Sequence, residues 1–189
     1  MKHSLLTVAA AAFVLSAAGN MKAADPDSSQ AAAYCQQTGG TVITRVPVYG
    51  TNGPESSWLV LTGPRQFCQY TSPTDGSRIH VLLQTLYATT PTLAALAYYA
   101  KVPANPPGPG NPASYYCTQL GGSDLFGGVN AAGGGWVGKG SVDQVLEACI
   151  FPDMSSIDSW GLTYNSAGII RGIDLTTVLR YAPPPASNK

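Results

Sequence analysis

The sequence predicts an α+β protein made of two tandem small modules, each stapled by a disulfide. The main observation is an internal repeat, because residues 29–40 and 111–122 both carry a Tyr-Cys pair followed by two glycines. In each copy a second Cys follows at nearly the same spacing, and a similar apolar segment, 93–100 or 175–182, closes the copy. A repeat of roughly 80 residues buries little surface by itself, so a covalent staple is expected in each module.

The start of the chain predicts export. Lys2 and His3 precede an apolar run that is too short to span a bilayer, and small residues follow it. This pattern is typical of a signal peptide over residues 1–18, with cleavage after position 23 as an alternative. The protein is therefore expected to be periplasmic or secreted.

The rest of the chain divides at a segment dense in Pro and Gly, which predicts an extended and fairly stiff linker. The predicted parts are a first module at 29–100, the linker at 101–112, a second module at 111–182 and a tail at 183–189.

The four cysteines can pair in three ways. Two self-similar units with two cysteines each favour Cys35–Cys68 and Cys117–Cys149, and an exported protein meets an oxidising compartment where such bridges persist. A metal site is a weaker interpretation, because the chain has no CxxC pattern and keeps only His80 once the signal peptide is removed. No metal and no cofactor are predicted.

Each module is expected to contain a short N-terminal helix, an antiparallel hairpin or three-stranded sheet, and a C-terminal helix. Ser29 and Asn111 have the side chains of helix caps at the two first helices. Alternating β-branched residues at 41–50 and an apolar run at 57–63 predict a hairpin, in which Pro47 favours an edge strand.

The second copy is expected to differ in detail. Its counterpart of the hairpin is glycine-rich over 127–140, which predicts a flexible connection, since no phosphate-binding motif accompanies the glycines. Ser155 or Ser156 is expected to cap a short helix, and Asp174 is expected to cap the last helix.

Residues 111–160 resemble one family of small exported bacterial domains. This family is named either for hemolysin or as a domain of unknown function. The match consists of the two cysteines of the second copy, Phe151, and the residues of the family motif: Asn111, Pro112, Ala113, Ser114, Tyr116, Gly121, Gly122, Pro152, Asp153, Asp158 and Trp160. The first copy matches only faintly. The resemblance implies an exported domain but no mechanism and no catalytic residues.

Two groups of residues are candidates for chemistry. Asp153, Asp158 and Asp174 suggest an acidic cluster, but helix caps and a turn explain them better, since Asp158 aligns with His80 of the first copy. His80 has the residue type for general base catalysis at neutral pH, but its neighbours are apolar and no catalytic motif accompanies it.

Composition narrows the functional classes. The formal net charge is zero and only 11% of residues are charged, which argues against binding to nucleic acid. The function expected is non-catalytic: a binding or inhibitor-like pair of modules whose partner is a protein or another envelope component. The alternatives are a membrane-active protein of the hemolysin kind and a hydrolase that uses His80. No stable membrane insertion is expected, because neither a spanning helix nor a basic amphipathic helix is visible in the sequence.

Overall fold

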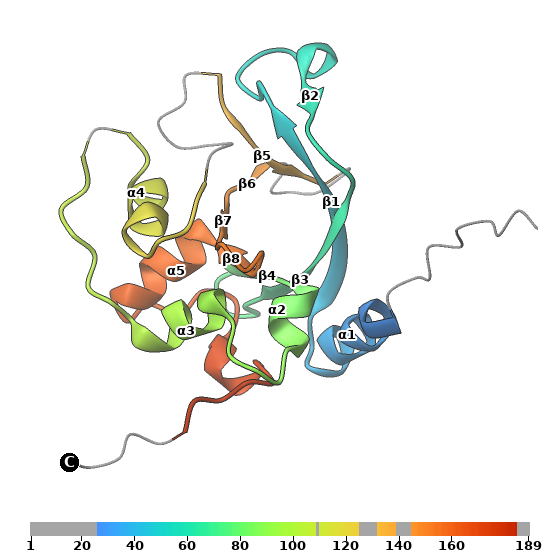
Figure 1. Ribbon diagram of the computed structural model, residues 1–189, viewed down its shortest axis with the longest axis vertical. Coiled ribbons are helices and arrows are strands. Elements are labelled where there is room, and N and C mark those ends of the chain that lie inside the picture. Colours follow the sequence, from blue (N-terminus) through green and yellow to red (C-terminus); the bar gives the residue numbers. More distant parts are fainter. Residues whose placement is uncertain (1–25, 109, 125–131, 139–144, 185–189) are drawn as a thin grey trace, which may run out of the picture.

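A curled antiparallel sheet runs through the protein, and both halves of the chain contribute strands to it (Figure 1). The computed structural model describes residues 26–108, 110–124, 132–138 and 145–184, so the predicted signal peptide and most of the tail lie outside the described residues. The strand order is β6-β5-β1-β3-β4-β8-β7, and β2 pairs with β1. The strands are β1 (Thr41–Tyr49), β2 (Leu59–Val60), β3 (Arg65–Thr71), β4 (Arg78–Leu82), β5 (Gly134–Val137), β6 (Val145–Leu146), β7 (Ala148–Ile150) and β8 (Ser156–Asp158).

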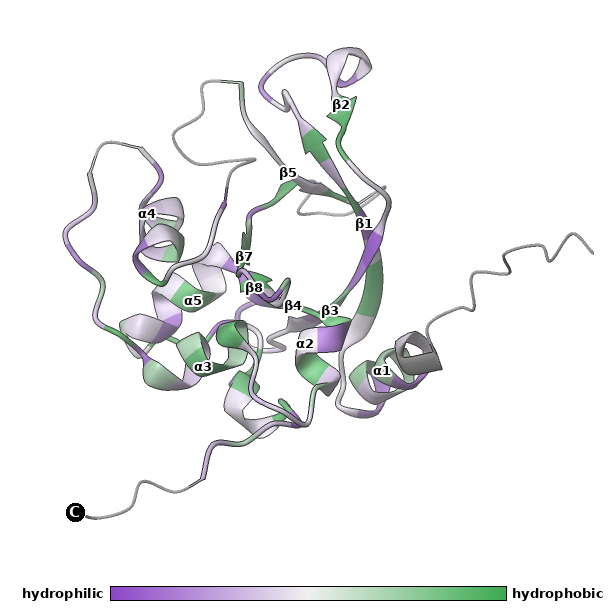
Figure 2. Ribbon diagram, viewed as in Figure 1, coloured by the Kyte–Doolittle hydropathy of each residue, from purple (hydrophilic) through white to green (hydrophobic). Residues whose placement is uncertain are grey.

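The helices gather around the curled sheet, while the β1–β2 hairpin projects away from them (Figure 1). Figure 2 shows apolar residues on the sides of the helices and strands that face each other, and a second apolar spot at β2. The helices are α1 (Pro26–Gln37), α2 (Leu83–Tyr87), α3 (Leu93–Ala100), α4 (Pro112–Gln119) and α5 (Ser159–Ser166), with short 3-10 turns η1 (Glu55–Ser57) and η2 (Leu175–Thr177).

The predicted class, α+β with antiparallel strands, is confirmed, but two separate modules are not seen. Strand β1 of the first half pairs with β5 of the second half, and β4 pairs with β8. The main core cluster also mixes the halves, as Leu83 and Leu162 both belong to it. Joining the sheets pairs strand edges that each half alone would leave open, and it gives the chain one larger core.

The expectation that Pro47 lies on an edge strand is wrong. The first part of β1 pairs with β3, and its last part pairs with both β2 and β5. Proline has no N–H to donate at this position, but its carbonyl still accepts from the backbone N–H of Leu61, the residue after β2, at 2.9 Å.

Both disulfides join the predicted partners, Cys35–Cys68 and Cys117–Cys149. Each bridge ties the first helix of its repeat to a strand of the same repeat, α1 to β3 and α4 to β7. All four cysteines are fully buried. The staples therefore lie in the shared core, where they hold one helix each against the sheet.

Some of the expected helix ends are correct. The side chain of Asn111 caps α4 by accepting from the N–H of Ala113 at 2.9 Å. The expectation for Ser29 is wrong, because α1 already begins at Pro26. Neither Ser155 nor Ser156 caps the short helix expected after them: Ser156 lies in β8, and Asp158 caps α5 by accepting from the N–H of Gly161. The hydroxyl of Ser155 instead accepts from the N–H of Ala94, in the first turn of α3, at 2.9 Å.

The expectation of a C-terminal helix over residues 175–182 is also wrong. Asp174 caps only the 3-10 turn η2, accepting from the N–H of Thr176 at 3.0 Å. The backbone then leaves the helical path, because the N–H of Arg180 donates to the carbonyl oxygen of Leu86 at 3.1 Å. Pairing with α2 replaces a further helical turn.

Candidate functional site

A hollow of about 890 Å³ lies between the linker and α4. Residues 104–108 form one wall, and α4 forms the other with Ser114, Tyr115 and Tyr116 among the residues that line it. Most of the exposed surface of the lining is apolar, with three prolines and two tyrosines among its fourteen residues. A concave, mainly apolar surface with a few polar groups is the usual form of a ligand site.

Three hydrogen bonds hold the linker along α4. The hydroxyl of Tyr116 donates to the carbonyl of Val102 at 2.6 Å, and the side-chain amide of Gln119 donates to the carbonyl of Pro103 at 2.8 Å. The same Gln119 side chain accepts from the N–H of Asn105 at 2.9 Å. The wall made by residues 104–108 is therefore anchored at its start.

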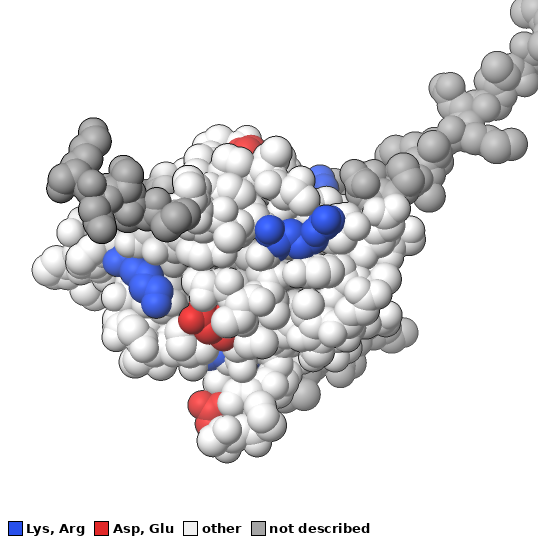
Figure 3. Space-filling view, turned by 90° about the horizontal axis from the view of Figure 1, so that it is seen from below, with Lys and Arg blue, Asp and Glu red and all other residues white. Residues whose placement is uncertain are grey.

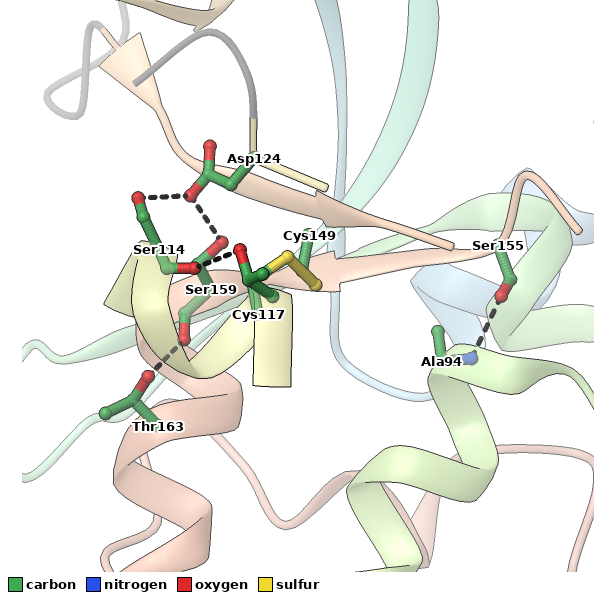
Figure 4. Close-up of a disulfide and its surroundings, with 9 residues drawn as sticks. Ala94, Ser114, Cys117, Asp124, Cys149, Ser155, Ser159 and Thr163 are labelled. Atoms are coloured by element: carbon green, nitrogen blue, oxygen red, sulfur yellow. Dashed lines mark hydrogen bonds between the residues drawn. A yellow bond between two sulfur atoms is a disulfide. The ribbon is translucent and has the colours of Figure 1, made fainter. Parts of the chain in front are cut away.

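Asp124 is the charged residue among those that line this hollow, and Figure 4 shows its carboxylate beside the hydroxyls of Ser114 and Ser159. Its Oδ2 atom accepts from the hydroxyl of Ser114 at 3.1 Å and from the hydroxyl of Ser159 at 2.8 Å. The side chain is only 7% exposed, and its Oδ1 atom has no hydrogen-bond partner among the described residues. Burial raises the pKa of Asp124 above its usual value, although the two serine hydrogen bonds oppose the shift.

A second, smaller hollow of about 200 Å³ lies where β4 and β8 meet. Its lining combines charged groups from both halves of the chain with apolar side chains: Arg78, His80, Val145, Leu146, Glu147, Asp158, Trp160 and Arg171. Burial raises the pKa of Glu147, and hydrogen bonds from Asn111 and Trp160 oppose that shift. The nearby carboxylates of Asp124 and Asp158 raise it further.

His80 and Asp158, the positions that align in the internal repeat, are in contact in this region. The backbone N–H of His80 donates to Oδ2 of Asp158 at 2.5 Å, and the imidazole Nδ1 lies 3.5 Å from the same oxygen. The other ring nitrogen, Nε2, lies 2.9 Å from Oε1 of Gln69 and 3.4 Å from Nη2 of Arg45. No serine, threonine or cysteine is a hydrogen-bond partner of His80 in the described part of the chain, and the ring is only 3% exposed.

The motif residues of the second repeat lie on α4, just after its end, in the turn between β7 and β8, and at the start of α5. Asn111 connects the start of α4 to Glu147, because its amide donates to Oε2 at 2.5 Å. Pro112 is the first residue of α4, Ala113 is buried, and Gly121 and Gly122 follow the end of the helix. Pro152 is exposed in the turn between β7 and β8.

Asp153, in the same turn, binds the neighbouring helix. It accepts from the N–H of Leu93 at 2.8 Å and from the N–H of Ser155 at 3.0 Å. Burial opposes ionisation, but these hydrogen bonds together hold the pKa of Asp153 below its usual value. Asp153, Asp158 and Asp174 thus each bind backbone N–H groups at separate places. No cluster of metal-ligating side chains occurs in the ranges that the structure describes.

Asp124 and Glu147 were not singled out by the sequence analysis. The available signal was weak: counted from the second glycine of each pair, Asp124 stands where the first repeat has Val42. An acidic residue where the other repeat has an apolar one indicates a position with a different role in the second half. The first repeat likewise has Ala32 where the second has Ser114, so only the second repeat carries this carboxylate and its serine partner.

Charged side chains do not form a continuous patch on the face shown in Figure 3, where small basic and acidic groups lie apart on a largely uncharged surface. None of the helices in the described residues is both long and apolar enough to span a membrane. No family model, curated protein or solved structure matches this chain. The resemblance of residues 111–160 to the hemolysin-named domains therefore stays a prediction, and the class defined by the fold is an α+β protein with two disulfides.

Proposed function

We propose that this is an exported, non-catalytic binding protein, and that its ligand occupies the hollow between residues 104–108 and α4. The observation that carries the proposal is the mainly apolar hollow of about 890 Å³ with the buried carboxylate of Asp124 in its lining. The ligand or partner segment is largely apolar, because most of the exposed surface of the hollow is apolar. Its place of action is the periplasm or the outside of the cell, where the two disulfides persist.

The anchored linker supports this function. Hydrogen bonds from Tyr116, Gln119 and Asn105 fix the wall before any ligand arrives, so binding loses little conformational freedom. Among its described lining residues the hollow has no His, Cys or Lys, and its one carboxyl group, Asp124, accepts from the hydroxyls of Ser114 and Ser159. These contacts favour binding over catalysis.

The first repeat does not contain an equivalent of this site. The linker runs along α4 alone, and Asp124 and Ser114 are replaced by Val42 and Ala32 in the first repeat. The proposed binding protein, or inhibitor-like protein, therefore has no counterpart of this carboxylate and its serine in the first repeat, which contributes the larger part of the sheet.

Filling the hollow is expected to abolish binding while leaving the fold intact. Thr118 is exposed on α4 and lines the hollow, so Thr118→Trp places an indole inside it. The matched control is Gln36→Trp, because Gln36 is the exposed residue that follows the corresponding cysteine on α1 and does not line the hollow. The measurements are the fluorescence of an apolar dye and pull-down from envelope extract. Thr118→Trp is expected to lower both at least tenfold, whereas equal binding by the two variants would contradict the proposal.

A membrane-active role is the second candidate, and one observation favours it. Leu59, Val60 and Leu61 are 61%, 68% and 48% exposed at the end of the β1–β2 hairpin, far from the helices (Figure 2). Adjacent residues of a strand point to opposite faces, so both faces of this tip are apolar. The tip is nevertheless short compared with the roughly 10 residues per strand that a membrane barrel requires.

The mature protein is therefore expected not to lyse membranes. Dye release from liposomes, measured at micromolar concentrations of protein with its disulfides intact, is expected to equal the release without protein. A variant with Val60→Asp is the control, because it removes the most exposed apolar side chain without touching the core. Release by the natural protein that the variant lacks would establish the membrane-active role instead.

A further inference from the structure

The small hollow between β4 and β8 has an exposed indole on its rim. Trp160 is 36% exposed, and it follows the first residue of α5. Its ring packs on Tyr164 with the two centroids 5.8 Å apart and the planes tilted by 34°. The guanidinium of Arg171 lies over the Tyr164 ring, 5.0 Å from its centroid.

The position of this indole is set before any ligand binds. Tyr164 packs against the indole from the same helix, and Arg171, in the segment after α5, packs in turn on the Tyr164 ring. Helix α5 itself is held at its start by Asp158, which also binds the backbone of His80. An exposed aromatic ring that is already immobilised offers a large contact area, and binding orders it no further.

The hollow is lined by as many positive as negative side chains, apart from His80. The lining contains two guanidinium groups, Arg78 and Arg171, and two carboxyl groups, Glu147 and Asp158, so it has no strong preference for an ion of either sign. The same groups supply both hydrogen-bond donors and acceptors. Val145 and Leu146 add apolar surface beside Trp160.

A neutral molecule with one apolar face and several hydroxyl groups satisfies both properties of this lining. We propose that the hollow binds a single pyranose ring of a neutral carbohydrate, with the apolar face of the sugar on Trp160 and its hydroxyls directed to Arg78, Glu147 and Arg171. A volume of about 200 Å³ suits one ring and not an extended chain. This site is separate from the hollow beside α4, so it is a second binding activity and does not depend on the proposed function.

Saturation-transfer NMR on the full-length mature protein tests the proposal with glucose, galactose and N-acetylglucosamine as probes. Inorganic phosphate and acetate, whose effect is followed by protein chemical shifts, serve as anionic controls. At least one neutral sugar is expected to receive saturation on its ring protons at millimolar concentration, and the Trp160 indole N–H resonance is expected to shift with it. No transfer to any of the three sugars, or a larger shift of that resonance with phosphate or acetate, would overturn the proposal.

Two variants and one control connect the binding to this hollow. Trp160→Ala is expected to weaken sugar binding at least tenfold, whereas Trp58→Ala, at the distant hairpin, is expected to leave it unchanged. Val145 is exposed on its strand and lines the hollow, so Val145→Arg is expected to block it. This variant tests the sugar site if Trp160→Ala does not fold. Sugar binding that survives in a folded Trp160→Ala or Val145→Arg protein would refute the site. Loss of sugar binding with dye binding retained beside α4 separates this proposal from the proposed function.

Discussion

Replacing Gly122 with alanine is expected to destabilise the protein by about 3 kcal/mol or more, because the new methyl group has no room beside the disulfide. A Cβ atom at this position would lie 2.4 Å from the sulfur of Cys149 and 3.0 Å from the sulfur of Cys117. Both sulfurs are fully buried between α4 and β7, so neither can move without shifting the core. The measurements are urea unfolding of the oxidised protein and titration of free thiols, which is expected to detect incompletely formed bridges.

The neighbouring glycine is the matched control. Gly121 has a φ of +83°, and no atom lies within 4 Å of the place that an added methyl group would take, so Gly121→Ala loses only the left-handed preference of glycine, about 1–2 kcal/mol. The first repeat has the same arrangement, since Gly39 has a φ of +86° and a Cβ on Gly40 would lie 2.2 Å from the sulfur of Cys68. Equal stability of Gly121→Ala and Gly122→Ala, both with complete disulfides, would contradict this explanation of the glycine pairs.

Removing the carboxylate of Asp158 is expected to have an effect of similar size, about 3–5 kcal/mol, because it leaves buried backbone N–H groups without partners. Asp158 is 4% exposed and accepts from the N–H of His80 and the N–H of Gly161. One oxygen thus joins the first half to the second half, and the other begins α5. Asp158→Ala therefore weakens the junction of the two halves as well as the helix cap.

Asp174→Ala is the control, since Asp174 caps only η2 and is half-buried; it is expected to lose about 1 kcal/mol. Urea unfolding followed by tryptophan fluorescence and far-ultraviolet circular dichroism measures both variants. The natural protein is expected to unfold in one transition with coincident curves, because the halves share a core. Two separate transitions in the natural protein, or equal effects of the two substitutions, would contradict the shared core.

Local features of the chain were predictable because they depend on neighbouring residues. Asn111 before Pro112 marks a helix start, and the alternating residues at 41–50 mark a strand. The disulfide pairing was also predictable, because the two repeats divide the cysteines into two similar pairs. The failures at Ser29 and at 175–182 have different causes: α1 begins earlier than its cap residue suggests, and the bond from Arg180 to Leu86 joins positions distant in the sequence.

The candidate sites were not predictable in the same way. Asp124, Ser114 and Ser159 are separated in the chain and meet only because α4 packs on α5. Trp160 was identified through the motif, but its place on the rim of a hollow depends on Arg78 from the other half. A sequence pattern reports which side chains are available, and it does not report which distant ones share a hollow.

The sequence by itself determined the α+β class, the repeat, the two staples and the first helix of the second copy, since each follows from local spacing and residue type. Only the tertiary structure decided that the two halves form one sheet. The physical reason is that strand edges are satisfied by any partner of suitable register, and β4 finds β8 of the other repeat at Val81 and Ile157. That pairing brings His80 against Asp158 and creates the hollow beside Trp160.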